Sequence, residues 1–226
     1  MINKEISKTI FDKANLNNTL CLFCFPNKEM IIFESDNFYV LRNNFPVSLG
    51  HIMISSKEHF GSMGELELDL FDELIKIKTA LKKWHDYNEL SCLFFEHGRA
   101  GSCHSSQEHG EQCEHFHLNC ITSKICLHQD LKQEFTKNYS IISISDICDL
   151  FAKWGDYLYF ENCFSEKAYY PLIQKKIPPH YLRTLICKHH NTVEKADWKK
   201  HQSLDDFHEN HLFTKSLGAW LKREFE

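Results

Sequence analysis

The clearest periodic pattern in the chain lies at residues 65–86. Apolar residues recur there at three- and four-residue spacing, which is typical of a helix with one buried face. The stripe consists of Leu66, Leu70, Leu74, Ile77, Leu81 and Trp84. Most of the nearby lysines lie off this stripe, so we predict a long helix that packs on the core and has no chemical role.

Short apolar or alternating runs indicate about five strands before residue 123, at 31–34, 37–41, 51–55, 91–96 and 114–122. A short amphipathic helix is predicted at 3–18. Beyond residue 123 the pattern predicts helices at 127–138, 178–189 and 204–222, and strands at 141–144, 156–160 and 168–173. Because no Gly/Ser/Pro-rich linker separates the halves, we expect a domain at 1–123 and an extension at 124–226 packed on that core.

The run at 114–122 alternates between apolar and polar residues. Phe116, Leu118 and Cys120 fall on one side, whereas His115, His117 and Asn119 fall on the other, because successive strand side chains point to opposite faces. Imidazoles are costly to bury without partners. This face therefore predicts a site in which histidine is a metal ligand, a nucleophile or a general acid or base.

Composition narrows the class of protein. Hydrophobic residues make up 42% of the 226 residues, and the net charge is −5, which argues against a strong nucleic-acid-binding surface. No apolar run approaches the ~18 residues of a membrane span, and the first residues lack the apolar region of a secretory signal. The ten cysteines are therefore expected to be reduced thiols of a cytoplasmic protein.

The pair Cys21-x-x-Cys24 can bring two thiolates to one ion. A redox pair or two buried thiols is the alternative, and a metal site needs two further ligands from elsewhere. A second group, Cys103, His104, His109 and Cys113, lies in a polar loop. A solvated loop explains it better than a second metal does.

Several motifs together carry a family resemblance. They are Cys21-Leu-Phe-Cys24, the segment 33–38, Pro46-Val47-x-x-Gly50-His51 leading to Lys57-x-His59, and Gly110 followed by His115-x-His117-x-Asn119. Over residues 20–123 this order resembles the zinc-bearing CxxC branch of the histidine-triad (HIT) superfamily. Glu96-His97-Gly98 and Pro179-x-Tyr181-Leu-Arg183 resemble a bacterial subgroup. The implied fold is α+β: a HIT-like antiparallel sheet of about five strands with a long packing helix, plus an α/β extension.

The resemblance implies a metal site. Its ligands are Cys21, Cys24, His59 and His115, which form a closed Cys₂His₂ set with no position left for a substrate water. We therefore expect one structural zinc ion per chain, which would fix the N-terminal segment to the strand that carries the histidines.

The resemblance also implies roles for the remaining site residues. His117 matches the family nucleophile, which attacks the α-phosphorus of a nucleotide. Gln112 and the amides around Gly110 are candidate donors to phosphate oxygens. Asn119 replaces the usual His or Gln, and it can donate a hydrogen bond but cannot act as an acid. Asn43 matches an acidic ribose-binding residue, and His51 matches a histidine near the triad, for which a purely structural role is the alternative.

These expectations favour a hydrolase of nucleotide phosphoanhydride or phosphoramidate bonds, with dinucleoside polyphosphates as substrates. The amide at Asn119 suggests a nucleotidyltransferase or phosphorylase as the second interpretation. A third is a catalytically weak nucleotide- or RNA-associated adaptor that uses the extension to bind a partner. The resemblance also allows a homodimer, since many members of the superfamily are two-fold dimers.

Overall fold

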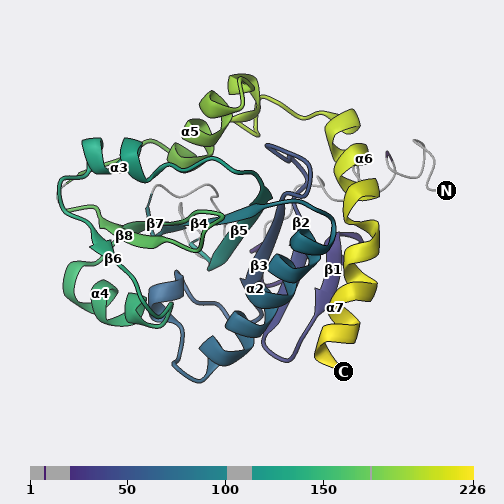
Figure 1. Ribbon diagram of the computed structural model, residues 1–226, viewed down its shortest axis with the longest axis horizontal. Helices are drawn as coiled ribbons and strands as arrows, with labels where there is room; N and C mark the ends of the chain where they lie inside the picture. The colour runs from purple at the N-terminus through teal and green to yellow at the C-terminus, as the bar shows by residue number, and fades with distance from the viewer. Residues whose placement is uncertain (1–7, 9–20, 101–113, 174) are drawn as a thin grey trace.

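The centre of the protein is one antiparallel β-sheet, shown in the computed structural model of Figure 1, which describes residues 8, 21–100, 114–173 and 175–226. The strand order in the described part is β1-β2-β3-β5-β4-β7-β8-β6. The strands are β1 (Ile31–Glu34), β2 (Phe38–Arg42), β3 (Ile52–Ser56), β4 (Cys92–Gly98), β5 (His117–Thr122), β6 (Tyr139–Ser140), β7 (Tyr157–Glu161) and β8 (Lys167–Pro171).

The α+β class and the antiparallel sheet are confirmed, but the prediction of about five strands is wrong. The described residues contain eight strands in one sheet, of which β6, β7 and β8 come from the second half of the chain. They join the sheet because β7 pairs with β4, with His97 opposite Leu158. The boundary between 1–123 and 124–226 stays a prediction, although this sheet runs across it.

One face of the sheet is covered by α2 (Leu70–Tyr87), α4 (Asp146–Trp154) and α7 (Leu217–Phe225). The apolar stripe of α2 packs on the sheet, where Leu74, Ile77 and Leu81 are fully buried together with Ile54 and Leu118. The helix begins at residue 70 rather than 65, because a 3₁₀ turn at Met63–Glu65 precedes it. The long helix therefore lies behind the face that carries His117.

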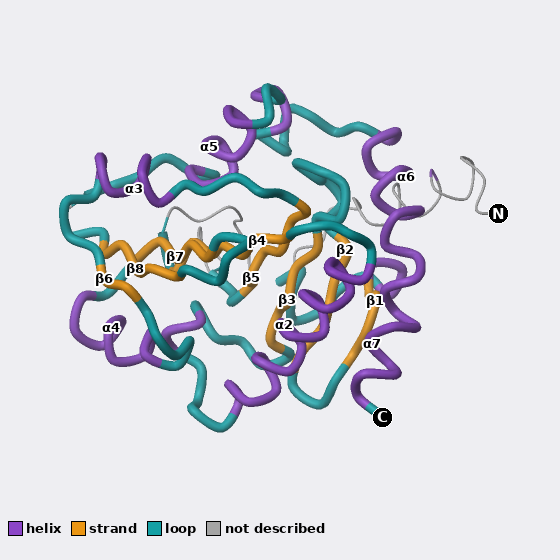
Figure 2. Tube along the Cα trace, in the orientation of Figure 1, coloured by secondary structure: helices purple, strands orange, loops and turns teal. Residues whose placement is uncertain are grey.

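The opposite face is covered by α3 (His128–Glu134) and α5 (Tyr181–His189), which Figure 2 shows above the sheet. Leu131, Leu182 and Ile186 pack with sheet residues such as Phe95 and Phe160 in a second buried cluster. The helix α6 (Leu204–Phe213) lies beside the β2–β3 loop. Both halves of the chain therefore contribute to the face on which the candidate site lies.

The turn before β3 is fixed by α6. The Gly50 N–H donates to Asn210 Oδ1 at 2.9 Å, and Asn210 Nδ2 donates to the His51 carbonyl at 3.0 Å. Gly50 has φ +74°, and a Cβ there would lie 2.3 Å from Thr122 Oγ1, so this position requires glycine. The C-terminal half therefore holds the loop that carries His51.

Two predictions about local structure differ from the fold, and one helix was not predicted. The strand expected at 141–144 is instead β6, two residues earlier, and the pattern gave no sign of α4. Just before this helix, the backbone N–H of Ser143 donates to Asp146 Oδ2 at 2.9 Å, which closes the turn that leads into it. The helix expected at 204–222 divides into α6, a 3₁₀ turn at Thr214–Ser216 and α7. The helix predicted at 3–18 lies almost wholly outside the described residues.

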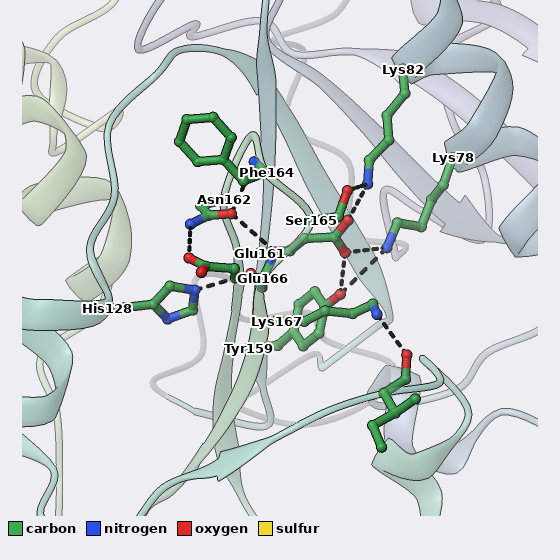
Figure 3. A network of polar contacts seen from close by, with 11 residues as sticks. Lys78, Lys82, His128, Tyr159, Glu161, Asn162, Phe164, Ser165, Glu166 and Lys167 are labelled. Carbon is green, nitrogen blue, oxygen red and sulfur yellow. Dashed lines mark hydrogen bonds and ion pairs between the residues drawn. The ribbon is translucent and has the colours of Figure 1, made fainter.

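A buried polar network joins α2 to the second half of the chain, as Figure 3 shows. Lys78 Nζ lies 2.5 Å from Glu161 Oε2 on β7, and Lys82 bonds the other oxygen of this carboxylate. Tyr159 also donates to Glu161. Burial is the largest single effect on the pKa of Glu161 and raises it. The two lysines together outweigh burial and lower this pKa to about 2. The carboxylate is therefore ionised between two cations.

Candidate functional site

Four potential metal ligands meet at one end of β5. Cys21 and Cys24 belong to a turn in which the Phe25 N–H donates to the Cys21 carbonyl at 3.1 Å. His59 follows β3, and His115 precedes β5. The ligand atoms of all four residues lie within 4.8 Å of one another. The structure thus brings together the four residues that the sequence predicted as ligands.

The spacing of these atoms suits a tetrahedral ion. His115 Nδ1 lies 3.4 Å from Cys21 Sγ and 3.5 Å from Cys24 Sγ. His59 Nδ1 lies 3.2 Å from Cys24 Sγ and 3.1 Å from His115 Nδ1. Bonds of ~2.3 Å to sulfur and ~2.0–2.1 Å to nitrogen place tetrahedral ligands about 3.3–3.8 Å apart, within a few tenths of an ångström of these separations. The donor set therefore fits a tetrahedral metal ion such as zinc.

The orientation of His115 also fits a metal ligand. Its Nε2 lies 2.9 Å from the Ser56 carbonyl, which can only accept a hydrogen bond, so the proton of the neutral ring is on Nε2. The lone pair of Nδ1 then faces the two sulfur atoms and His59 Nδ1. A backbone carbonyl that orients the far nitrogen in this way is typical of metal-bound histidine.

His117 is the first residue of β5 and points to the same side of the strand as Asn119. Its Nδ1–H donates to the carbonyl of His115 at 2.8 Å, which leaves a lone pair on Nε2. The ring stacks on Phe23, with centroids 4.6 Å apart and planes 11° apart. Burial lowers the pKa of His117, and the hydrogen bond to the His115 carbonyl opposes this shift. The imidazole is therefore neutral and held in one orientation.

Asn119 and His51 are paired next to it. The Val47 N–H donates to His51 Nδ1 at 3.2 Å, so Nε2 carries the proton and donates to Asn119 Oδ1 at 3.1 Å. Asn119 Nδ2 points to the Phe95 carbonyl at 3.4 Å. Burial is the main cause that lowers the pKa of His51 to about 3, so this ring is neutral. His51 thus fixes the orientation of the Asn119 amide, with the oxygen toward His51 and the nitrogen toward the Phe95 carbonyl.

Asn43 lies beside this pair. Its Nδ2 is 3.3 Å from His51 Nε2, and its Oδ1 accepts from the Phe45 N–H at 2.8 Å. The side-chain oxygen is thus engaged by its own loop, as in an Asx turn. The amide hydrogens are the groups that Asn43 can offer to a ligand.

His97 is a site residue whose role sequence reasoning missed. Phe95 of β4 pairs with Asn119 of β5, and continuing this register places His97 beside His117. The Leu182 N–H of α5 donates to His97 Nε2 at 3.1 Å. Burial lowers the pKa of His97 to about 3, with smaller contributions from His117 and His180. Only the Glu96-His97-Gly98 motif could have pointed to it.

The second half of the chain closes over this face. Arg183 of α5 is buried, and its guanidinium donates to the carbonyls of Phe45 at 2.5 Å and Ala196 at 3.0 Å. Phe45 in turn stacks on Trp198, with centroids 5.2 Å apart. Arg183 and the segment after α5 therefore hold the loop that carries Asn43.

Two further groups of three potential ligands occur among the described residues: His85, Cys92 and Cys120, and Cys126, His128 and Glu166. Both nitrogens of His128 are within hydrogen-bond distance of oxygen atoms, at 2.8 Å and 3.0 Å. His85 Nδ1 likewise donates to the Leu81 carbonyl at 2.8 Å.

The predicted phosphate donors Gln112 and Gly110 lie outside the described residues. The same is true of the loop group Cys103, His104, His109 and Cys113.

Fold and site together define an α+β protein with a buried histidine face beside a Cys/His group that can hold a metal ion. The chain belongs to the family described as proteins similar to the CwfJ C-terminal region, whose model matches residues 11–136. It is 24% identical over 222 residues to CWF19-like protein 1 of Mus musculus. That alignment covers 91% of this chain but 38% of the mouse protein, so the chain spans well under half the length of this curated relative.

Solved structures also resemble the chain. Yeast Ap4A phosphorylase Apa2 in complex with AMP is 13% identical, covers 89% of this chain and 97% of its own, and has a TM-score of 0.47. A HIT family hydrolase from Legionella pneumophila is 20% identical, with coverages of 45% and 91% and a TM-score of 0.31. Within the described residues, no helix is both long and apolar enough for a membrane crossing.

Proposed function

We propose that this chain hydrolyses nucleotide phosphoanhydride or phosphoramidate bonds through a covalent intermediate on His117, with dinucleoside polyphosphates as substrates. The observation that carries the proposal is the hydrogen bond from His117 Nδ1 to the carbonyl of His115 at 2.8 Å. A nucleophilic imidazole needs a lone pair on the attacking nitrogen, and this bond supplies it by keeping the proton on the other nitrogen.

The reaction proceeds in two displacements. His117 Nε2 donates its lone pair to the α-phosphorus, and the bond from that phosphorus to the leaving phosphate oxygen or nitrogen breaks, with its electron pair going to the leaving group. Water then attacks the same phosphorus, loses a proton to solvent, and the nitrogen–phosphorus bond returns its electrons to His117. The products are a nucleoside monophosphate and the leaving group.

The neighbouring polar groups have supporting roles in this proposal. His51 holds the Asn119 oxygen and the Phe95 carbonyl lies near one amide hydrogen, so the second N–H of Asn119 can donate to a phosphoryl oxygen. A donor aimed at developing charge typically contributes about 10²–10³ in rate. Asn43 offers its amide to the ribose hydroxyls. Neither amide can protonate a leaving group, so that proton comes from elsewhere.

The proposal includes one zinc ion bound by Cys21, Cys24, His59 and His115. Such a closed Cys₂His₂ set makes the metal structural, since no coordination position is left for substrate or water. The four residues would join the N-terminal turn to the segment that leads into β5. We propose a cytoplasmic protein with a nucleotide ligand; a homodimer stays a prediction.

The second candidate is a nucleotidyltransferase or phosphorylase, in which an acceptor other than water takes the nucleotide from His117. The observation that favours it is the amide at Asn119, which can orient a phosphate but is no acid. The third candidate, a nucleotide- or RNA-associated adaptor with little catalysis, follows from the same replacement of the usual His or Gln by Asn119. The hydrolase and the transferase differ in the group that accepts the nucleotide, and the adaptor differs from both in showing little turnover.

A screen of dinucleoside polyphosphates and nucleoside phosphoramidates, with products identified, tests the proposal. Wild type should release a nucleoside monophosphate with water as the acceptor. His117→Ala should show no turnover, whereas Asn119→Ala should lose about 10²-fold because it removes a donor and no covalent step. Transfer to phosphate would favour the phosphorylase. Absence of both products from wild type would favour the adaptor.

A further inference from the structure

Phe23 lies between the two cysteines of the candidate metal site and contacts two histidines at once. Its ring stacks on His117 at a centroid distance of 4.6 Å with 11° between the planes. It also lies 5.5 Å from the ring of His115, tilted by 38°. The side chain thus connects a candidate metal ligand to the candidate nucleophile.

We propose that Phe23 is a positioning residue for His117, and that binding of a metal at Cys21, Cys24, His59 and His115 is what holds it against the imidazole. This inference rests on the proposed function, because it concerns the histidine that the proposal makes the nucleophile. It adds a residue that does not touch substrate and a route by which metal occupancy affects the site.

The covalent geometry explains why the metal site controls Phe23. Only Leu22 and Phe23 separate the two cysteines, so the backbone at Phe23 is set by where the two sulfur atoms lie. Those sulfurs approach nitrogens that come from distant parts of the chain, Cys21 from His115 at 3.4 Å and Cys24 from His59 at 3.2 Å. With the four ligands joined by an ion, the turn cannot move away from β5.

The stacking contact restrains His117 in a way that its hydrogen bond does not. The bond from Nδ1 to the His115 carbonyl fixes one edge of the imidazole, but a single bond allows the ring to tilt about it. A parallel aromatic ring against one face opposes that tilt and keeps water off that face. An error of ~1 Å in the placement of a reacting group can cost ~10² in rate.

The same turn contains a matched control. Phe25 lies two residues beyond Phe23 and is 58% exposed. Its backbone N–H, which closes the turn on the Cys21 carbonyl, is unaffected by a change of side chain. Removing the Phe25 ring therefore alters the turn chemically to the same degree without touching His117.

The experiment compares zinc-loaded wild type with Phe23→Leu, Phe23→Tyr and Phe25→Leu. Zinc content is measured by elemental analysis. The ring resonances of His117, assigned by their loss in His117→Ala, are followed by NMR. The rate of nucleotidyl-adduct formation is measured with a dinucleoside polyphosphate. The NMR measurement does not require activity, so it decides the stacking claim even if wild type forms no adduct, an outcome that would remove the proposed function alone.

We expect Phe23→Leu to keep its zinc, to shift the His117 resonances through loss of the ring current, and to form adduct about 10- to 100-fold more slowly. Phe23→Tyr should restore both properties, and Phe25→Leu should resemble wild type. Removal of zinc from wild type with a chelator should move the His117 resonances in the same direction as Phe23→Leu. The proposal is overturned if Phe23→Leu reacts at the wild-type rate, if it loses its zinc, or if chelation leaves the His117 resonances in place.

Discussion

At the scale of single residues, backbone groups decide which nitrogen of each site histidine carries the proton. The Val47 N–H occupies Nδ1 of His51, and the Leu182 N–H occupies Nε2 of His97. In His117 the backbone partner is an acceptor instead of a donor: the His115 carbonyl accepts from Nδ1, so that nitrogen carries the proton. Each choice follows from whether the backbone partner donates or accepts. His117 Nε2 thereby keeps the lone pair that the proposed chemistry uses.

The metal ligands give a prediction at this scale. Cys21→Ser should lower the zinc content from about one ion per chain and should lower the thermal midpoint, because structural zinc binding is coupled to folding. Cys163→Ser is a suitable control, since Cys163 is partly exposed and belongs to none of the groups of potential ligands among the described residues. Elemental analysis and thermal unfolding of both variants provide the measurement. Wild type purified without zinc, and as stable as the Cys21→Ser variant, would count against the metal site.

At the scale of elements, the short motifs predicted which side chains come together where the chain itself sets the geometry. Cys21 and Cys24 lie in one turn, and His117 and Asn119 lie two apart on one strand, so spacing alone places each pair. His97 and Arg183 could not be predicted in this way. Their positions depend on β4 pairing with β5 and on α5 crossing the sheet, and both are long-range contacts that local periodicity does not encode.

A buried carboxyl on β4 gives a prediction about pH. Burial raises the pKa of Glu96 to about 8, while hydrogen bonds from Tyr157 Oη at 2.6 Å and the Met63 N–H at 2.7 Å oppose the shift. The unfolded chain loses this proton near 4.5. Between these values the folded state binds more protons, so the stabilisation present below pH 4.5 is lost as pH rises to about 8.

The test compares wild type with Glu96→Gln, which cannot ionise. The free energy of unfolding of wild type should fall relative to the variant by at most about 1.4 kcal/mol per pH unit across that window, and the difference should level off above it. Denaturant titrations at a series of pH values measure this difference. A difference that does not change with pH would contradict the raised pKa.

At the scale of the whole molecule, one sheet unites the two halves of the chain. The sequence indicated the α+β class and the helix behind the site, because both follow from local hydrophobic patterns. It did not indicate that β7, β8 and β6 continue the sheet. The hydrophobic pattern of a strand such as 157–161 is the same whether the strand forms a separate layer or extends an existing sheet. The pairing of Glu96 with Tyr159 is decided by packing.

The ion network of Glu161 gives a prediction at this scale. Glu161→Gln leaves Lys78, which is buried, without its counter-charge, and it should destabilise the fold by about 3–5 kcal/mol. The surface pair of Lys83 and Glu224 is the control, and Glu224→Gln should cost about 0–1 kcal/mol. Denaturant unfolding of both variants provides the comparison. Equal effects of the two substitutions would show that the buried network does not stabilise the contact between α2 and β7.

The central claim is that His117 forms a covalent bond to a nucleotide, and intact-mass analysis after rapid acid-free quenching tests it most directly. Wild type mixed with a dinucleoside polyphosphate should gain the mass of one nucleoside monophosphate less water, and peptide mapping should place this mass on His117. His117→Ala should gain none. His189→Ala, a change at an exposed histidine of α5, should label like wild type. An adduct of equal yield in His117→Ala, or one mapped to another residue, would contradict the account.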